Sequence, residues 1–126
     1  MSRSLFTSRH GGFSRNEYES FNLAKHVGDD PEVVESNRKL LAKELGIDRS
    51  NLFFINHVHG SRVVEIDESS SYLQELDADA LFTRRSGVAL AVLTADCIPL
   101  LLSSHQLSLQ CISAEKDLSP GYLRQL

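Results

Sequence analysis

The sequence lacks several features that would place it in a specialised class of protein. Only two cysteines, Cys97 and Cys111, occur in 126 residues, so a disulfide-rich scaffold is excluded and a reducing compartment is expected. Lys and Arg number 13 against 17 Asp and Glu. The longest basic cluster is Arg84-Arg85, which argues against nucleic acid as a partner. Without repeats or low-complexity segments, the composition is that of one globular domain.

Long apolar segments are also missing. The longest, Val88 to Leu102, is interrupted by Asp96 and is too short to cross a bilayer. Arg9 and His10 interrupt the N-terminal segment before the apolar part of a signal peptide could form. We therefore expect a cytoplasmic protein that does not have a membrane as a partner.

One segment carries the signals of an α-helix at both ends. Asp30 can accept hydrogen bonds from the first turn, and Pro31 suits the first helical position. Gly46 suits the left-handed residue that ends a helix. Apolar residues recur between them at helical spacing, so we predict a helix over Pro31–Leu45. The preceding residues, 10–30, have no sustained period and are expected to form a long loop.

Elsewhere, short apolar segments with a period of two predict strands. These are Ser4–Ser8, Leu52–His59, Arg62–Asp67, Ala78–Thr83, Val88–Leu93, Ile98–Ser103 and Leu107–Ser113. Gly60-Ser61 is expected to form a two-residue hairpin turn. Val88–Leu93 is apolar on both faces, as is typical of a buried central strand. One helix among sequential strands predicts an α+β fold, with mixed or antiparallel sheets flanked by helices.

The predicted hairpin places two histidines on one strand face. His57 and His59 lie two residues apart, which separates strand side chains by about 7 Å and suits two ligands of one small metal ion. The alternative is that one histidine is solvated at the turn and the other is hydrogen-bonded in the core. Zinc requires a third protein ligand that this spacing does not supply. Both interpretations remain open on the spacing alone.

A second candidate site follows the predicted central strand, in Thr94-Ala95-Asp96-Cys97. Asp96 interrupts an apolar segment, and Pro99 requires the chain to bend or bulge. A thiolate together with imidazoles suits zinc, and also copper. The alternative is an inert buried Cys97 with Asp96 capping a turn.

The predicted helix contributes a third candidate. Arg38 shares a stripe with apolar residues, and Asn37 lies beside it. A buried guanidinium needs a partner, such as Asp96 or a bound anion. The alternative is an arginine whose charged end reaches the surface.

Five short segments of the chain carry a resemblance when taken in order. They are Ser20-Phe21-Asn22-Leu23 with His26-Val27-Gly28-Asp29-Asp30, then Asn37-Arg38, His57-Val58-His59-Gly60, Ala78-Asp79-Ala80-Leu81 and Thr94-Ala95-Asp96-Cys97-Ile98-Pro99. Together they resemble the signature of the YfiH-like proteins, also known as the laccase-domain or multicopper polyphenol oxidase family. His57 stands where the family has Gln. The resemblance covers residues 4–102.

The resemblance implies a single-domain α+β enzyme with a YfiH-like fold that acts on purine nucleosides. Family members combine phosphorolysis of adenosine, inosine, guanosine and methylthioadenosine with adenosine deamination, and an older label reflects copper-dependent oxidation. It implies that His59 and Cys97 bind zinc, or alternatively copper, together with a later histidine. Asp96 would orient a ligand or act as a base. Purine nucleosides and phosphate are the expected partners.

Three further residues are candidates for binding phosphate or substrate. Arg38 and Asn37 belong to a segment that resembles the family, whereas Arg62 lies outside its motifs. Each carries a cationic group or N–H donors that suit an anion.

The C-terminal part departs from the family. The third metal ligand belongs to a His-Ala-Gly-Trp-Arg-Gly block, but residues 107–113 read Leu-Ser-Leu-Gln-Cys-Ile-Ser, and the chain has no tryptophan. We therefore expect residues 1–126 to form one incomplete unit with a divergent or frameshifted tail at 103–126. His57 is the best-placed substitute for the missing ligand, ahead of His105 and Cys111.

This departure leaves three functional interpretations. The first is a metal-dependent purine nucleoside enzyme whose short form has little or no activity. The second is a hydrolase in which Cys97 is the nucleophile and His59 its base. The third is a non-catalytic truncated fragment with an exposed sheet edge. The sequence does not determine the oligomeric state.

Overall fold

A computed structural model describes residues 3–94, 97–104 and 108–113 of the chain. It contains one α-helix, α1 (Pro31–Leu45), and two short 3-10 helices, η1 (Asn16–Tyr18) and η2 (Arg49–Asn51), within those ranges. The strands are β1 (Leu52–His57), β2 (Val63–Glu65), β3 (Leu76–Ala78), β4 (Ala80–Thr83), β5 (Ala89–Ala91), β6 (Ile98–Ser103) and β7 (Ser108–Ser113).

Helix α1 has the bounds that the sequence predicts, and local chemistry accounts for both ends. The Asp30 carboxylate accepts a hydrogen bond of 2.9 Å from the backbone N–H of Glu32, and Pro31 occupies the first turn. Gly46 has a φ of 72° and ends the helix in the left-handed conformation. The predicted helix is therefore confirmed.

The strands form two sheets. In the three-stranded sheet, of order β3-β1-β5, strand β1 pairs in parallel with both neighbours. In the four-stranded sheet, of order β2-β4-β7-β6, β2 and β4 are parallel, whereas β7 is antiparallel to β4 and β6. One helix with one parallel and one mixed sheet confirms the predicted α+β class.

Three expectations about the strands are wrong. Residues 52–67 do not form a hairpin, because β1 and β2 belong to different sheets and the chain crosses from one to the other between them. Residues 4–8 are described and exposed, but contain no strand. Val88–Leu93 was expected to be a central strand. Within the described part of the chain, however, its strand β5 lies at an edge of its sheet, and β1 lies at the centre.

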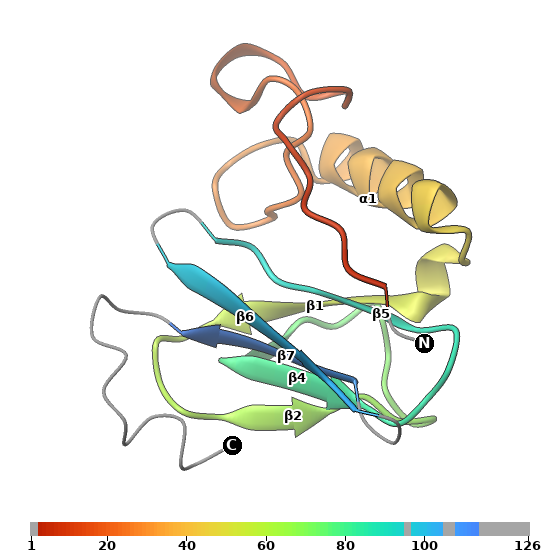
Figure 1. Ribbon diagram of the computed structural model, residues 1–126. Helices are drawn as coiled ribbons and strands as arrows, with labels where there is room; N and C mark the ends of the chain where they lie inside the picture. Colours follow the sequence, from red (N-terminus) through yellow and green to blue (C-terminus); the bar gives the residue numbers. More distant parts are fainter. Residues whose placement is uncertain (1–2, 95–96, 105–107, 114–126) are drawn as a thin grey trace.

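The elements form three layers, with the three-stranded sheet in the middle (Figure 1). On one face of β1, Leu52 and Phe54 join a core cluster with Leu41 of α1. On the other face, Phe53 and Ile55 join a second cluster that reaches the four-stranded sheet. All four residues are buried, as expected of a strand covered on both faces.

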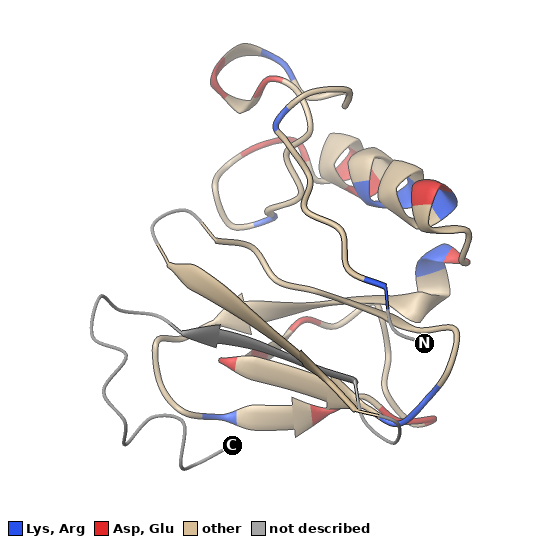
Figure 2. Ribbon diagram, viewed as in Figure 1, with Lys and Arg blue, Asp and Glu red and all other residues tan. Residues whose placement is uncertain are grey.

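Charged residues of both signs are interspersed along α1 and the N-terminal loop (Figure 2). Several of them pair, as in the contact of 2.7 Å between Arg49 Nε and Glu35 Oε1. No helix within the described ranges is both long and apolar enough to cross a membrane.

Candidate functional site

The two sheets meet where the chain crosses between them twice. The β1–β3 pair ends with His57 opposite Ala78, and the β2–β4 pair begins with Val63 opposite Ala80. Residues 58–62, which we call the crossing segment, therefore connect the same two points as the single residue Asp79. The register alone brings Asp79 beside the segment that carries His59.

Asp79 is the anchor of the crossing segment. Asp79 is buried, with 3% of the residue exposed. Its carboxylate accepts hydrogen bonds from the backbone N–H of Gly60, at 2.9 Å, and of Arg62, at 3.2 Å. The backbone N–H of Asp79 donates in turn to the Arg62 carbonyl, at 2.8 Å. A buried carboxylate with backbone donors on both oxygens holds this segment in one conformation.

The crossing segment brings the two histidine rings together. The ring centroids of His57 and His59 lie 4.4 Å apart, with the ring planes tilted by 53°. His59 lies beyond the end of β1 and has a φ of 57°. The left-handed backbone of His59, rather than the predicted strand alternation, therefore brings the rings together.

His57 contains an unsatisfied buried atom. Its Nε2 lies 3.3 Å from Asp79 Oδ1, but the two are not aligned as a hydrogen bond. Nε2 is buried and has no hydrogen-bond partner among the residues that the structure describes. Burial lowers the pKa of His57 below its usual value, a protonated His59 lowers it further, and the Asp79 carboxylate opposes both. The neutral imidazole, which is the form that binds metals, is therefore favoured.

Cys97 lies just before β6 and is half-buried. Its side chain packs against the core cluster that contains Phe53 and Ile55. Strand alternation places His57 on the same face of β1 as Phe53 and Ile55. Cys97 and His57 therefore lie on the same side of β1, the side that faces the four-stranded sheet. Asp96 lies outside the described residues.

The residues present fit a metal ion in kind but not in number. Imidazole and thiol are the donors that zinc and copper prefer, and the orphaned His57 Nε2 could be satisfied by such a ligand. Among the described residues, however, no group of three His, Cys, Asp or Glu side chains is placed to hold a metal ion. The described residues therefore supply suitable donor atoms but no complete metal site.

Arg38 has a structural position, which argues against the predicted phosphate-binding role. Its side chain is fully buried, and its Nε and Nη2 donate to the Leu23 carbonyl, at 2.9 and 2.6 Å. Nη1 pairs with Glu75 Oε1 at 2.5 Å, and the guanidinium lies 3.9 Å from the centroid of the Phe54 ring. Glu75 is thus the charged partner that the structure gives this buried guanidinium.

Asn37 and Arg62 are the other two residues predicted to bind phosphate or substrate. Asn37 is fully buried, accepts from the Phe13 backbone N–H at 2.8 Å and donates to the Asn22 carbonyl at 2.8 Å, so its amide holds the N-terminal loop. Arg62 is exposed, and its backbone binds Asp79. Of the three predicted phosphate ligands, Arg62 alone has an accessible side chain.

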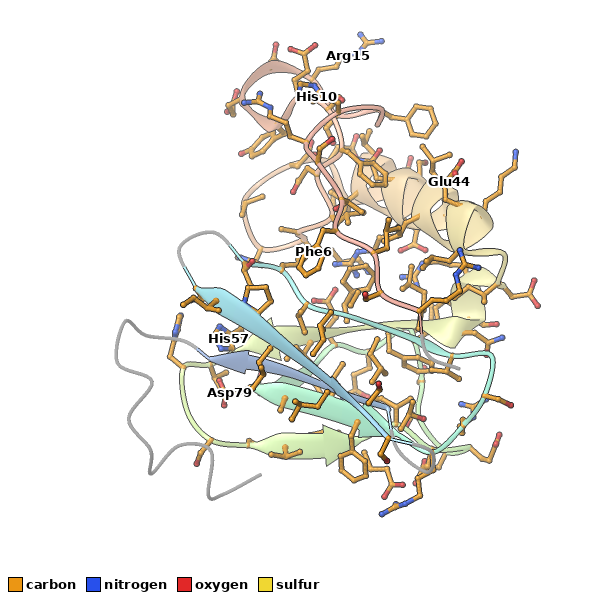
Figure 3. The ribbon with its side chains drawn as sticks, in the orientation of Figure 1. Phe6, His10, Arg15, Glu44, His57 and Asp79 are labelled. Atoms are coloured by element: carbon orange, nitrogen blue, oxygen red, sulfur yellow. The ribbon has the colours of Figure 1, made fainter. Side chains whose placement is uncertain are left out.

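Asp79 is the site residue that reasoning from the sequence missed. It stands between Ala78 and Ala80 in an apolar segment, where the alternation predicts one continuous strand. A buried acidic residue in such a segment needs partners, and that requirement was the available signal. Figure 3 shows His57 and Asp79 side by side at one end of the sheets, with His10 far away in the N-terminal loop.

The sequence of the chain is similar to those of a known protein family. Residues 3–112 match the family model described as multi-copper polyphenol oxidoreductase laccase. A purine nucleoside phosphorylase of Corynebacterium glutamicum is 48% identical over 102 residues, which cover 80% of this chain and 42% of the relative. One of Streptomyces coelicolor is 47% identical over 98 residues, 78% of this chain and 40% of the relative. The chain thus spans about 40% of the length of these curated relatives.

Solved structures share the fold. YlmD of Geobacillus stearothermophilus superposes with a TM-score of 0.79 at 30% identity, covering 86% of this chain and 43% of that one. The YfiH protein of Bacillus licheniformis gives the same TM-score at 25% identity, with 83% and 43% covered. The predicted YfiH-like fold is therefore confirmed. Because the family model matches most of the chain, the chain belongs to the multi-copper polyphenol oxidoreductase laccase family.

Proposed function

We propose that this chain supplies part of the active site of a purine nucleoside enzyme, with His59 and Cys97 as metal ligands and His57 as the substitute for the missing third ligand. The three side chains would have to move together to form this site. The pairing of the His57 and His59 rings beside Asp79 carries the proposal. The names of the curated relatives, purine nucleoside phosphorylases, supply the substrate class: purine nucleosides and phosphate.

The state of the two imidazoles supports a ligand at this point. A buried nitrogen without a hydrogen-bond partner among the described residues, His57 Nε2, is costly unless a ligand satisfies it in the working protein. The left-handed backbone of His59 carries a conformational cost that is typical of functional sites.

The proposed chemistry has two parts. His59 and Cys97 would hold a zinc or copper ion, which would act as the Lewis acid that adenosine deamination by water requires. Phosphorolysis requires a cationic group near the phosphate, and Arg62 is the predicted candidate whose side chain is exposed. The proposed substrates are adenosine, inosine, guanosine and methylthioadenosine, with Asp96 as a base or an orienting group.

Zinc titration tests the ligand assignment. Competition between the chain and a chromophoric zinc chelator is expected to show one ion per chain, with affinity reduced about tenfold or more in His59→Ala and in Cys97→Ala. His26→Ala is the matched control, because His26 is an exposed histidine of the N-terminal loop. Equal zinc affinity in the wild type and the His59 variant would refute the assignment. Alkylation of Cys97 by iodoacetamide at a rate unaffected by zinc would favour the Cys–His hydrolase instead.

Nucleoside turnover tests the substrate class. With inosine and phosphate, the chain alone is expected to release hypoxanthine slowly, because the third family block is missing. Release that exceeds the protein-free rate and disappears in His59→Ala supports the proposal. Release that persists unchanged in both His59→Ala and Cys97→Ala contradicts it.

A further inference from the structure

We infer that Asp79 is the positioning residue of the candidate metal site: it fixes the crossing segment that carries His59 and orients the ring of His57. The inference rests on the proposed function, in which both histidines are ligands. The family resemblance assigns Asp79 no such role. Two connections join the sheets at this point, one of five residues and one of a single residue.

The crossing segment depends on Asp79 for its shape. Five residues can span the gap between β1 and β2 in many conformations, and none of them belongs to a helix or strand. Both carboxylate oxygens of Asp79 select one conformation by accepting from Gly60 and Arg62. These are charge-assisted hydrogen bonds in a buried setting, which makes them stronger than neutral ones.

The anchor also explains how His59 adopts its left-handed backbone. A non-glycine residue in this region is conformationally strained, and the hydrogen bond from the next residue, Gly60, to Asp79 helps to offset that strain. Gly60 has no side chain between its backbone and the carboxylate. A Cβ built there would lie 3.2 Å from Asp79 Oδ2, so a side chain at this position would press on the anchor.

Asp79 acts on His57 through the ring itself. The two side chains lie together (Figure 3), with Asp79 Oδ1 3.3 Å from His57 Nε2. The negative charge of the carboxylate beside Nε2 favours the ring orientation that presents this nitrogen to a cation. One buried side chain thus controls both histidines.

The first test uses the metal-free chain, so that it does not depend on the proposed function. Nuclear Overhauser contacts between the His57 and His59 rings, and slow amide exchange at Gly60 and Arg62, are expected in the wild type. Asp79→Ala should remove the ring contacts and the protection. Asp79→Asn, which keeps the size but places an N–H₂ against a backbone N–H, should reduce them.

Asp77→Ala is the matched control. Asp77 lies on the same strand, is exposed, and accepts a hydrogen bond from Asn56 Nδ2 at 2.7 Å, whereas Asp79 accepts the described side-chain hydrogen bonds from the crossing segment. It should leave ring contacts and protection unchanged. Unprotected Gly60 and Arg62 amides in the wild type would overturn the inference even if an Asp79 variant failed to fold. So would ring contacts that survive in Asp79→Ala.

The second test measures zinc by the same chelator competition. Asp79→Ala and Asp79→Asn are each expected to weaken binding about 10- to 100-fold, with Asp77→Ala equal to the wild type. If the wild type binds zinc through His59 and the Asp79 variants bind equally tightly, the inference fails and the proposed function stands. If the wild type binds no zinc but Asp79→Ala loses the ring contacts, the proposed function fails and the positioning role stands.

Discussion

The N-terminal loop, residues 9–30, and the crossing segment, residues 58–62, are both irregular, and both are held by buried polar side chains. Asn37 and Arg38, from α1, bind the loop. Asp79, between β3 and β4, binds the crossing segment. In each case buried side chains supply hydrogen bonds that regular secondary structure would otherwise provide.

The two regions differ in what remains unsatisfied. Around Asn37 and Arg38, the amide and guanidinium groups have partners within the protein. Around Asp79, the Nε2 of His57 is buried without a hydrogen-bond partner among the described residues. Satisfied buried polar groups stabilise a fold, whereas an unsatisfied one is costly unless a ligand or water binds it. The comparison therefore separates a structural anchor from a candidate site.

The largest expected effect is at Arg38. Arg38→Met removes the buried charge and leaves the Leu23 carbonyl and Glu75 without their partner, which should lower the free energy of unfolding by about 3–5 kcal/mol. Urea denaturation measures this change. The control is Lys39→Met, an exposed basic residue of the same helix. A cost no larger than that of the control would contradict the structural role and return Arg38 to the candidate phosphate ligands.

Asn37→Ala should have the next largest effect on the free energy of unfolding. It removes hydrogen bonds to Phe13 and Asn22 and leaves buried backbone groups unpaired, at a cost of about 2–3 kcal/mol. Proteolysis within the N-terminal loop should also become faster, which limited digestion would show. Ser36→Ala, an exposed residue that bonds only to its own helix in the described contacts, serves as the control. Equal digestion rates in the two variants would disprove the anchoring role.

His57→Gln should have a smaller effect on stability. The substitution introduces the residue that the family carries there and leaves no established hydrogen-bond partner unpaired, so the free energy of unfolding should change by less than about 1 kcal/mol. Zinc affinity should fall in the same protein. A loss of stability as large as that of Asn37→Ala would show that His57 is a structural residue and would remove the contrast between the two regions.

The smallest effect concerns pH and the loop. Hydrogen bonds from the Ser14 hydroxyl, at 2.6 Å, and the Asn22 amide, at 3.0 Å, lower the pKa of Asp29. A lowered carboxyl pKa stabilises the folded loop above the unfolded pKa of about 4. That contribution is lost as the pH falls through the lowered native value. Amide exchange in the loop should therefore quicken in acid, and Asp29→Asn should abolish this pH dependence. An equal acid response in the variant would assign it to other groups.

Local sequence was sufficient to predict some elements in full. Helix α1 begins at a capping aspartate and a proline and ends at a glycine, and these residues act on neighbours within one turn. The strands β6 and β7 were also predicted with nearly their observed bounds. Such elements depend on periodicity and on turn chemistry, both of which can be read along the chain.

Pairing could not be predicted in the same way. Gly60-Ser61 between two apolar segments predicted a hairpin, yet β1 and β2 belong to different sheets. Parallel pairing of β1 with β3 and β5 depends on segments more than 20 residues away. The three residues of β3 carry no strand signal of their own. Long-range contacts thus overrode a local turn preference.

By itself, the sequence determined the helix, the α+β class and the family, whereas His59 and Cys97 as metal ligands stay predictions. The tertiary structure decided which buried polar groups are satisfied. Arg38 is neutralised by Glu75, a residue 37 positions along the chain, and Asp79 meets the crossing segment because two parallel strand pairs end at the same place. That a buried charge needs a partner can be inferred from the residue alone. Which residue becomes that partner depends on the tertiary contacts, which join positions far apart in the sequence.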